Sequence, residues 1–188
     1  MLIDRINDVI EFRDSLNPES DRGCALMAAA FLDAELDSLF RKYVVANPRV
    51  ADDLFGQSRP ISTFSSRIDL AYLLGLIDQV THRDLHLIRK IRNDFGHVHT
   101  PLTFEQAAIA ARVRELKTHF REGDVPPRMI FISCAVGALA ILHTALHNRQ
   151  PIAERQTPDV EAARVTANRL TEAFIAALED KPPSNADT

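Results

Sequence analysis

The stretch of residues 129–146 constrains the fold of this chain more than any other segment. Fourteen of its 18 residues are apolar, and the exceptions are Ser133, Gly137, His143 and Thr144. A helix that spans a membrane needs about 20 predominantly apolar residues, so this stretch lies at the limit. Because the other segments of the chain are amphipathic, we predict no membrane span. We expect instead a buried helix at the centre of a helical bundle or at a dimer contact.

The other segments carry apolar residues at the spacing of amphipathic helices. One long helix is predicted over residues 19–46, and its middle, residues 25–32, is apolar on nearly every side and should be central. Residues 49–66 contain glycine, proline and a cluster of Ser and Thr, which predicts an irregular connection. No segment alternates like a strand. We predict an all-α, single-domain bundle of about seven helices over residues 1–180, followed by a disordered tail at 181–188.

Capping motifs mark several of the expected helix starts. A Ser or Thr side chain before a helix accepts a hydrogen bond from a backbone N–H of the first turn. The expected caps are Thr81 with Asp84, Thr103 with Gln106, and Ser65 or Ser66. The helix that begins after Thr103 is expected to extend to Phe120.

The acidic balance of the chain limits its classes of partner. Lys and Arg number 22 against 26 Asp and Glu, which gives a net charge of −4 and an isoelectric point near 6.0. Domains that bind nucleic acid usually carry a basic face. Contact with DNA or RNA would therefore need a local patch, for which the candidates are Arg112, Arg114, Lys117 and Arg121. Nucleic acid remains a possible partner that the sequence does not make evident.

The cysteines and the first residues predict a cytoplasmic protein. Cys24 and Cys134 both lie in apolar stretches, where free thiols are usually buried. Two such cysteines suit a reducing compartment better than a disulfide framework. Asp4 and Arg5 interrupt the first residues at once, which is unlike a signal peptide.

One predicted helix, within residues 85–99, carries residues that could act on a phosphate. Gly96 is expected to end it, and Arg92, Asn93 and His97 lie near this end. An arginine can hold a phosphate, and a histidine titrates near neutral pH. Arg92 could stabilise a charged phosphorane while His97 acts as acid or base, so the pair could cleave RNA without a metal. The same pattern is also typical of a surface helix with a basic face.

Further polar residues are candidates for binding near this pair. These candidates are Arg67, Arg89, Asn93, Asp33 and Glu35. Asp33 or Glu35 could hold Arg92 or His97 by a charge-assisted hydrogen bond, or could lie on a solvated face. Arg67 could supply a second phosphate contact, although a plain salt bridge is the simpler role. A structural ion pair between Arg92 and one of these acids is the alternative to catalysis.

The sequence predicts neither a metal site nor a cofactor. His143 and His147 are four residues apart, which is a metal-competent spacing on a helix. No third ligand lies near them in the sequence, and no Cys/His pattern has the spacing of a zinc site.

The residues Arg92-Asn93-Asp94-Phe95-Gly96-His97 resemble the Arg-Asn-x-x-x-His motif of HEPN domains. These domains are small helical bundles that dimerise. Many of them are metal-independent ribonucleases, and many others keep the fold for binding only. The resemblance implies Arg92 and His97 as the catalytic pair of a ribonuclease, with Asn93 fixing the geometry of the motif.

A longer resemblance involves three blocks that occur in order. These blocks are residues 21–26, 62–77 and 87–97, and they resemble the mannitol operon repressor family over roughly residues 10–150. Gly96 stands where an alanine-like small residue is expected, which is a mild departure. The resemblance implies an all-helical cytosolic regulator of transcription that controls the use of a sugar alcohol.

The combined interpretation is a regulator that works through other proteins. The chain has no Gly-bearing helix-turn-helix with a basic recognition helix, and its net charge is acidic. We therefore expect a protein partner in transcription regulation and an isologous homodimer. The alternative is a HEPN-like metal-independent ribonuclease or RNA-binding module.

Overall fold

The computed structural model describes residues 2–97, 101–157 and 159–179, and within them it contains helices and no strands. The prediction of an all-α protein is confirmed, with eight described helices where about seven were expected. The chain divides into two compact units, residues 1–153 and 154–188. The tail predicted at 181–188 lies outside the described residues, and the domain boundary at residue 180 stays a prediction.

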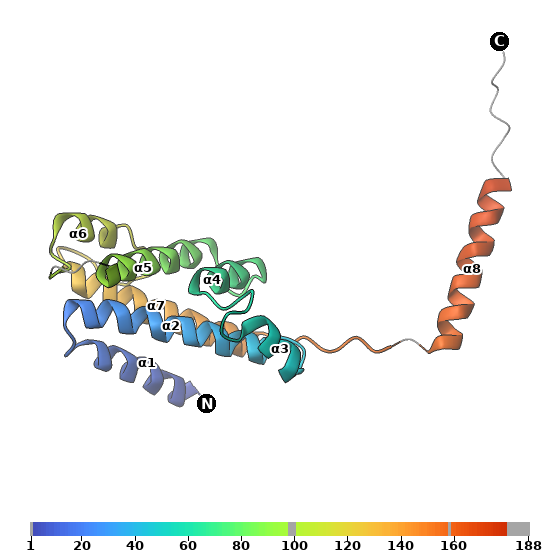
Figure 1. The fold of residues 1–188 in the computed structure, drawn as a ribbon, viewed down its shortest axis with the longest axis horizontal. Coiled ribbons are helices and arrows are strands. Elements are labelled where there is room, and N and C mark those ends of the chain that lie inside the picture. Colours follow the sequence, from blue (N-terminus) through green and yellow to red (C-terminus); the bar gives the residue numbers. More distant parts are fainter. Residues whose placement is uncertain (1, 98–100, 158, 180–188) are drawn as a thin grey trace, which may run out of the picture. The chain divides into compact units, whose positions relative to one another are not determined.

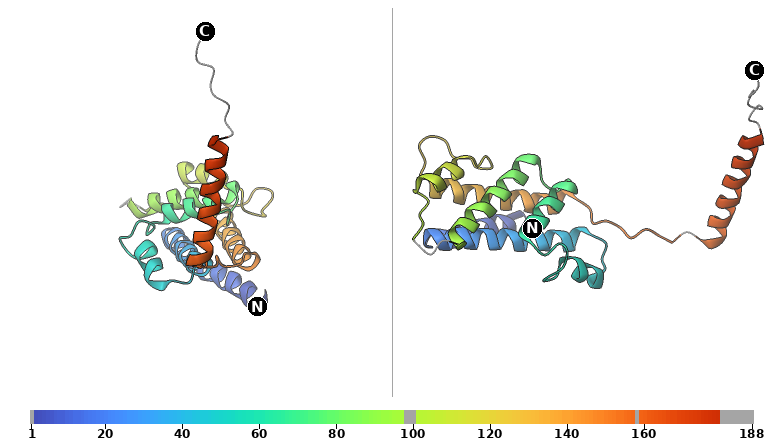
Figure 2. Two further views of the ribbon diagram at one scale, coloured as in Figure 1. Left: turned by 90° about the vertical axis from the view of Figure 1, so that its right-hand side faces the viewer. Right: turned by 45° about the horizontal axis from the view of Figure 1, so that its top comes forward.

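The first unit holds seven of the described helices (Figure 1; two further views in Figure 2). They are α1 (Leu2–Leu16), α2 (Asp21–Tyr43), α3 (Pro48–Phe55), α4 (Phe64–Leu73), α5 (Gln79–His97), α6 (Ala107–Arg114) and α7 (Pro127–Asn148). Helix α2 contacts α1, α3, α4, α5 and α7, so it is the central element that the sequence predicted. Figure 1 shows α5 and α7 running along α2, and these two helices also contact each other.

One face of α2 forms the middle of the hydrophobic core. Its fully buried positions recur every three or four residues and are Cys24, Ala25, Ala28, Ala29, Leu32, Leu36, Leu39 and Phe40. The alanines remove side-chain bulk, so neighbouring helices can approach closely. Leu26, Met27 and Phe31 point away from this face and are partly exposed, at 37–40 % of their surface. The apolar middle of α2 is therefore wider than the face that this unit buries.

Helix α7 is long enough and apolar enough to cross a membrane by composition alone. In the structure it packs against α1, α2, α5 and α6. Its inward positions join the core and include Phe131, Cys134, Ala138 and Leu142, each at most 1 % exposed. The prediction of a core helix in a bundle is confirmed, but the helix is buried only on its inward side.

Part of the stretch predicted to be irregular, residues 49–55, belongs to the helix α3 (Pro48–Phe55). The side chain of Asn47 accepts a hydrogen bond from the Val50 N–H, and Pro48 occupies the first turn. Asn47-Pro48 thus begins a helix, because proline is favoured at the first helical position, whereas α2 has already ended at Tyr43. Ala51 and Phe55, four residues apart, bury the inner face of α3.

The expected capping residues were partly wrong. Helix α4 is capped by Thr63, in a capping box with Ser66. Thr81 lies inside α5 as its third residue, and its N–H donates to the Asp78 side chain. Gln106 occupies the N-cap of α6 without capping it and instead donates to the Pro101 carbonyl. These positions differ by two or three residues from the expected ones, and at α4 the shift arises among three neighbouring candidates, Thr63, Ser65 and Ser66. Gly96 lies within α5, which is described to His97.

The predicted partner of Thr81, Asp84, has a different role at the heart of the unit. Its side chain is fully buried, and one carboxylate oxygen accepts hydrogen bonds from the Lys117 N–H at 2.7 Å and the Thr118 N–H at 2.6 Å. The Cys134 thiol lies 3.7 Å from the same oxygen. Burial, together with this neighbouring carboxylate, raises the pKa of Cys134, which keeps the thiol protonated. The carboxylate binds the backbone after α6 and stops that helix at Arg114, short of the expected Phe120.

The second unit contains one described helix, α8 (Val160–Glu179). Its apolar side chains recur at helical spacing, and Val160, Leu170 and Phe174 are each at least 66 % exposed. Within the described residues of this unit, no side chain is buried.

Replacement of Asp84 by alanine is expected to lower the free energy of unfolding by roughly 2–3 kcal/mol, because two partly buried N–H groups lose their acceptor. Asp84→Asn keeps one acceptor oxygen and should cost less. Urea unfolding followed by circular dichroism measures both effects. The matched control is Asp53→Ala, which removes an exposed ion pair with Arg59. Equal losses for Asp84→Ala and Asp53→Ala would show that the buried carboxylate does not hold the 115–118 turn.

Candidate functional site

The C-terminal end of α5 holds the residues predicted to act on a phosphate. Arg92 and Asn93 are half-buried, and His97 is exposed. Arg92 donates from Nη1 to Asn93 Oδ1 at 2.9 Å. The guanidinium of Arg22, on α2, donates from Nε to the Phe95 carbonyl at 2.8 Å. A positive charge at the end of a helix is favourable, because the last carbonyls carry a partial negative charge.

The charged residues next to this helix end differ in their contacts. Asp94 forms an ion pair with Arg112 of α6, one of the basic residues that the sequence placed in a candidate nucleic-acid patch. Arg89 lies one turn before Arg92, and its Nε is buried without a hydrogen-bond partner among the described residues. The end of α5 is therefore a partly buried set of polar side chains with an exposed histidine at its edge.

Arg67, predicted as a candidate for binding, lies in a network of ion pairs between α4 and α2. Nη1 donates to Asp33 at 2.7 Å, and Nη2 donates to Asp37 at 3.0 Å. Nη2 also donates to the Phe55 carbonyl at the end of α3, at 3.1 Å. Only 12 % of the Arg67 side chain is exposed, and its guanidinium binds groups of the same unit. Arg67 therefore forms the salt bridge that was the simpler of its two expected roles, the other being a phosphate contact.

Asp33 and Glu35 point to different helices, because they are two residues apart on α2. Asp33 faces α4 and pairs with Arg67, whereas Glu35 faces α7 and lies 3.3 Å from Nε2 of His143. Among the described residues, no ion pair joins either acid to Arg92 or His97. The two acids that were predicted near Arg92 and His97 therefore contact Arg67 and His143 instead.

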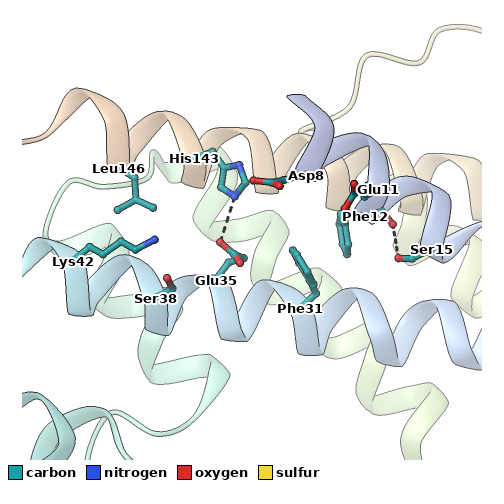
Figure 3. Close-up of a pocket in the computed structure, with 10 residues that line it drawn as sticks. All are labelled: Asp8, Glu11, Phe12, Ser15, Phe31, Glu35, Ser38, Lys42, His143 and Leu146. Atoms are coloured by element: carbon teal, nitrogen blue, oxygen red, sulfur yellow. Dashed lines mark hydrogen bonds and ion pairs between the residues drawn. The ribbon is translucent and has the colours of Figure 1, made fainter. Parts of the chain in front are cut away.

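Glu35 and His143 line a pocket of about 570 Å³ between α1, α2 and α7 (Figure 3). Its other lining residues are Asp8, Glu11, Phe12, Ser15, Phe31, Ser38, Lys42 and Leu146. The rings of Phe12 and Phe31 stack with centroids 4.5 Å apart and form its apolar wall. Carboxylates from two helices face one lysine and one histidine, so the pocket suits a polar ligand with several donors. Periodicity did not reveal it, because its residues lie up to 138 positions apart in the chain.

A second cluster of polar side chains joins α4 and α5. Nε2 of His82 and Nε2 of His86 each lie 2.9 Å from Oδ1 of Asp69. These hydrogen bonds lower the pKa of Asp69 below its ordinary value of 3.8. The two histidines are four residues apart, so the sequence alone already places them on one face of a helix. Asp69 could be added only once the structure placed α4 against α5.

A family model and a solved structure match this chain. The family model described as "Mannitol repressor" matches residues 14–129. A solved structure of the MtlR–HPr complex from Escherichia coli contains a similar chain, with a TM-score of 0.54 and 19 % sequence identity. That match covers 74 % of this chain and 96 % of the other. Among curated proteins, none matches the chain at a significant level.

Replacement of Arg67 by methionine is expected to lower the free energy of unfolding by about 2–3 kcal/mol. The change keeps the length of the side chain and leaves Asp33 and Asp37 without their shared cation. Arg13→Met is the control, because Arg13 and Asp14 form an exposed pair, which is worth at most about 1 kcal/mol. Thermal and urea unfolding of both variants measure the difference. Equal stability of the two variants would contradict a structural role for Arg67.

Proposed function

Because the chain belongs to the mannitol repressor family, we propose that it is a cytoplasmic regulator of transcription that acts by binding another protein. The match over residues 14–129 carries the proposal. It includes α2–α6 completely, with the end of α1 and the start of α7. The regulated genes are proposed to serve the use of a sugar alcohol, as the family description suggests.

HPr is the proposed protein partner. The solved structure with the similar fold was determined as a complex with HPr, and its chain matches over 96 % of its length. A surface that recognises a folded protein needs exposed apolar side chains within a polar rim. Leu26, Met27 and Phe31 on α2 and Leu73 at the end of α4 supply such side chains in the first unit.

The charges of the first unit support a protein partner over direct recognition of DNA. Binding of DNA needs cations that are free to neutralise phosphates. The guanidinium groups of Arg67, Arg112 and Arg128 instead pair with carboxylates of the same unit. The net charge of −4 adds a general repulsion toward a polyanion.

The proposed interaction is tested by titrating the full chain with purified HPr of the same organism in a calorimeter. We expect saturable binding with a dissociation constant in the micromolar range, about −8 kcal/mol, or tighter. An unrelated acidic protein of similar size is the control titrant. Absence of binding at about 100 µM of each protein, roughly −5.5 kcal/mol, would contradict HPr as the partner.

A homodimer is proposed as the working assembly. An apolar groove of about 350 Å³ lies between α1 and α7 and is lined by Ile6, Val9 and Ile10 on one side and Ala140 and Thr144 on the other. Ile6 and Ile10 are 50 % and 41 % exposed. The groove suits an isologous contact, in which α1 of each copy lies against the other copy.

Light scattering of the full chain at micromolar concentration is expected to give the mass of a dimer. Ile10→Asp places a charge in the groove and should shift the mass toward the monomer. Lys90→Asp, at an exposed position of α5, is the matched control and should leave the dimer intact. A monomeric wild-type protein would contradict the proposal.

The second candidate function is a metal-independent ribonuclease, proposed from the HEPN-like motif of α5. One observation favours it: Arg92 and His97 occupy the same helix end, and His97 is exposed. Against it stand the hydrogen bond of Arg92 to Asn93 and the ion pair of Asp94 with Arg112.

If the regulator proposal is right, the purified chain will not cleave RNA in the presence of EDTA. Single-stranded and structured RNAs, incubated with the wild type, His97→Ala and Arg92→Ala, provide the measurement, with folding of each variant checked by circular dichroism. Cleavage by the wild type that disappears in both folded variants would replace the regulator by the ribonuclease.

A further inference from the structure

Three side chains from α4 and α5 converge on one point at the surface of the first unit. His82 and His86 are four residues apart on α5, so their rings project from the same face of that helix. Asp69 projects from α4, which packs directly against α5. The two Nε2 atoms and one carboxylate oxygen lie within 4.8 Å of one another.

The packing around the cluster holds these side chains in place. The ring of Tyr72 lies 4.7 Å from the ring of His82, and the rings of His82 and His86 meet edge to face at 4.7 Å. Leu85 and Ile88, which flank His86 on α5, are fully buried and anchor the helix. Short connections and direct helix contact leave α4 and α5 little freedom to separate.

The distances are close to those that a tetrahedral metal site requires. Metal bonds of 2.0–2.2 Å to nitrogen and oxygen place two ligand atoms about 3.4 Å apart. The Nε2 atoms of His82 and His86 each lie 2.9 Å from Asp69 Oδ1, so each of these two distances must lengthen by about half an ångström to admit an ion. The side chains are 25 %, 21 % and 53 % exposed for His82, His86 and Asp69, so an ion can reach them from solvent.

We propose that Asp69, His82 and His86 form a binding site for Zn²⁺ with one coordination position open to solvent. Two imidazole nitrogens and one carboxylate suit zinc, whereas Mg²⁺ and Ca²⁺ prefer sites made of oxygen ligands. Three protein ligands with a fourth, open position is an arrangement that zinc adopts in proteins. In the absence of the ion, the two histidines share Asp69 as a hydrogen-bond acceptor, which keeps the three side chains together.

The proposal is tested by calorimetric titration of the metal-free full chain with Zn²⁺. We expect one ion per chain, and at least tenfold weaker binding for His82→Ala, His86→Ala and Asp69→Asn. His147→Ala is the matched control, because it disrupts the other histidine pair at i,i+4 spacing, His143 and His147 on α7, and leaves the cluster intact. Its affinity for Zn²⁺ should equal that of the wild type.

Loss of folding is separated from loss of a ligand by two further measurements. Each variant is melted with and without Zn²⁺, and its own metal-free midpoint is the reference for the shift. Co²⁺ serves as a spectroscopic probe, whose strong visible absorption in a tetrahedral site should appear in the wild type and in His147→Ala only. Absence of one-to-one binding, or binding that survives in His82→Ala and His86→Ala, would overturn the proposal.

Discussion

Arginine side chains that cross from one helix to another hold the first unit around α2. Arg67 of α4 binds Asp33 and Asp37 of α2, and Arg22 of α2 binds the Phe95 carbonyl at the end of α5. Arg128 of α7 pairs with Asp21 at 2.5 Å and donates to the Leu16 carbonyl at the end of α1 and to the Glu19 carbonyl between α1 and α2. Separating the partners of a partly buried ion pair leaves an uncompensated charge, so the pairs of Arg67 and Arg128 disfavour other positions of α4 and α7 on α2. Guanidinium groups in these contacts are paired within the unit and are not free to bind the phosphates of a nucleic acid.

The distribution of apolar residues in the sequence was enough to predict the fold class and the main helices. Residues of α7 and of the middle of α2 form long apolar stretches, most other helices carry apolar residues at helical spacing, and no segment alternates like a strand. The limits of the shorter helices depended on contacts between distant residues, which periodicity does not contain. Residues 48–55 were missed because Asn47-Pro48 was interpreted only as the end of α2. The expected helix from Thr103 to Phe120 was too long because buried Asp84 binds the backbone at Lys117 and Thr118.

Only those parts of the candidate site whose residues lie close together along the chain could be predicted from the sequence. Arg92, Asn93 and His97 could be identified because they lie on one helix. The partners of Asp33 and Glu35 could not, because Arg67 is 34 residues from Asp33 and His143 is 108 residues from Glu35. The cluster of His82, His86 and Asp69 was predictable in part. Their spacing was readable in the sequence, whereas the carboxylate that completes the cluster comes from a different helix.

A regulator that works through a protein should show little intrinsic affinity for DNA. The most direct test is the binding of the full chain to a fluorescent duplex of its own promoter at several salt concentrations, because the slope of log K against log salt counts the phosphates that are neutralised. We predict no sequence-specific binding at about 150 mM salt, with only the weak non-specific level at lower salt. Specific binding at about 10 nM or tighter with a steep salt dependence would contradict a regulator that needs a protein partner.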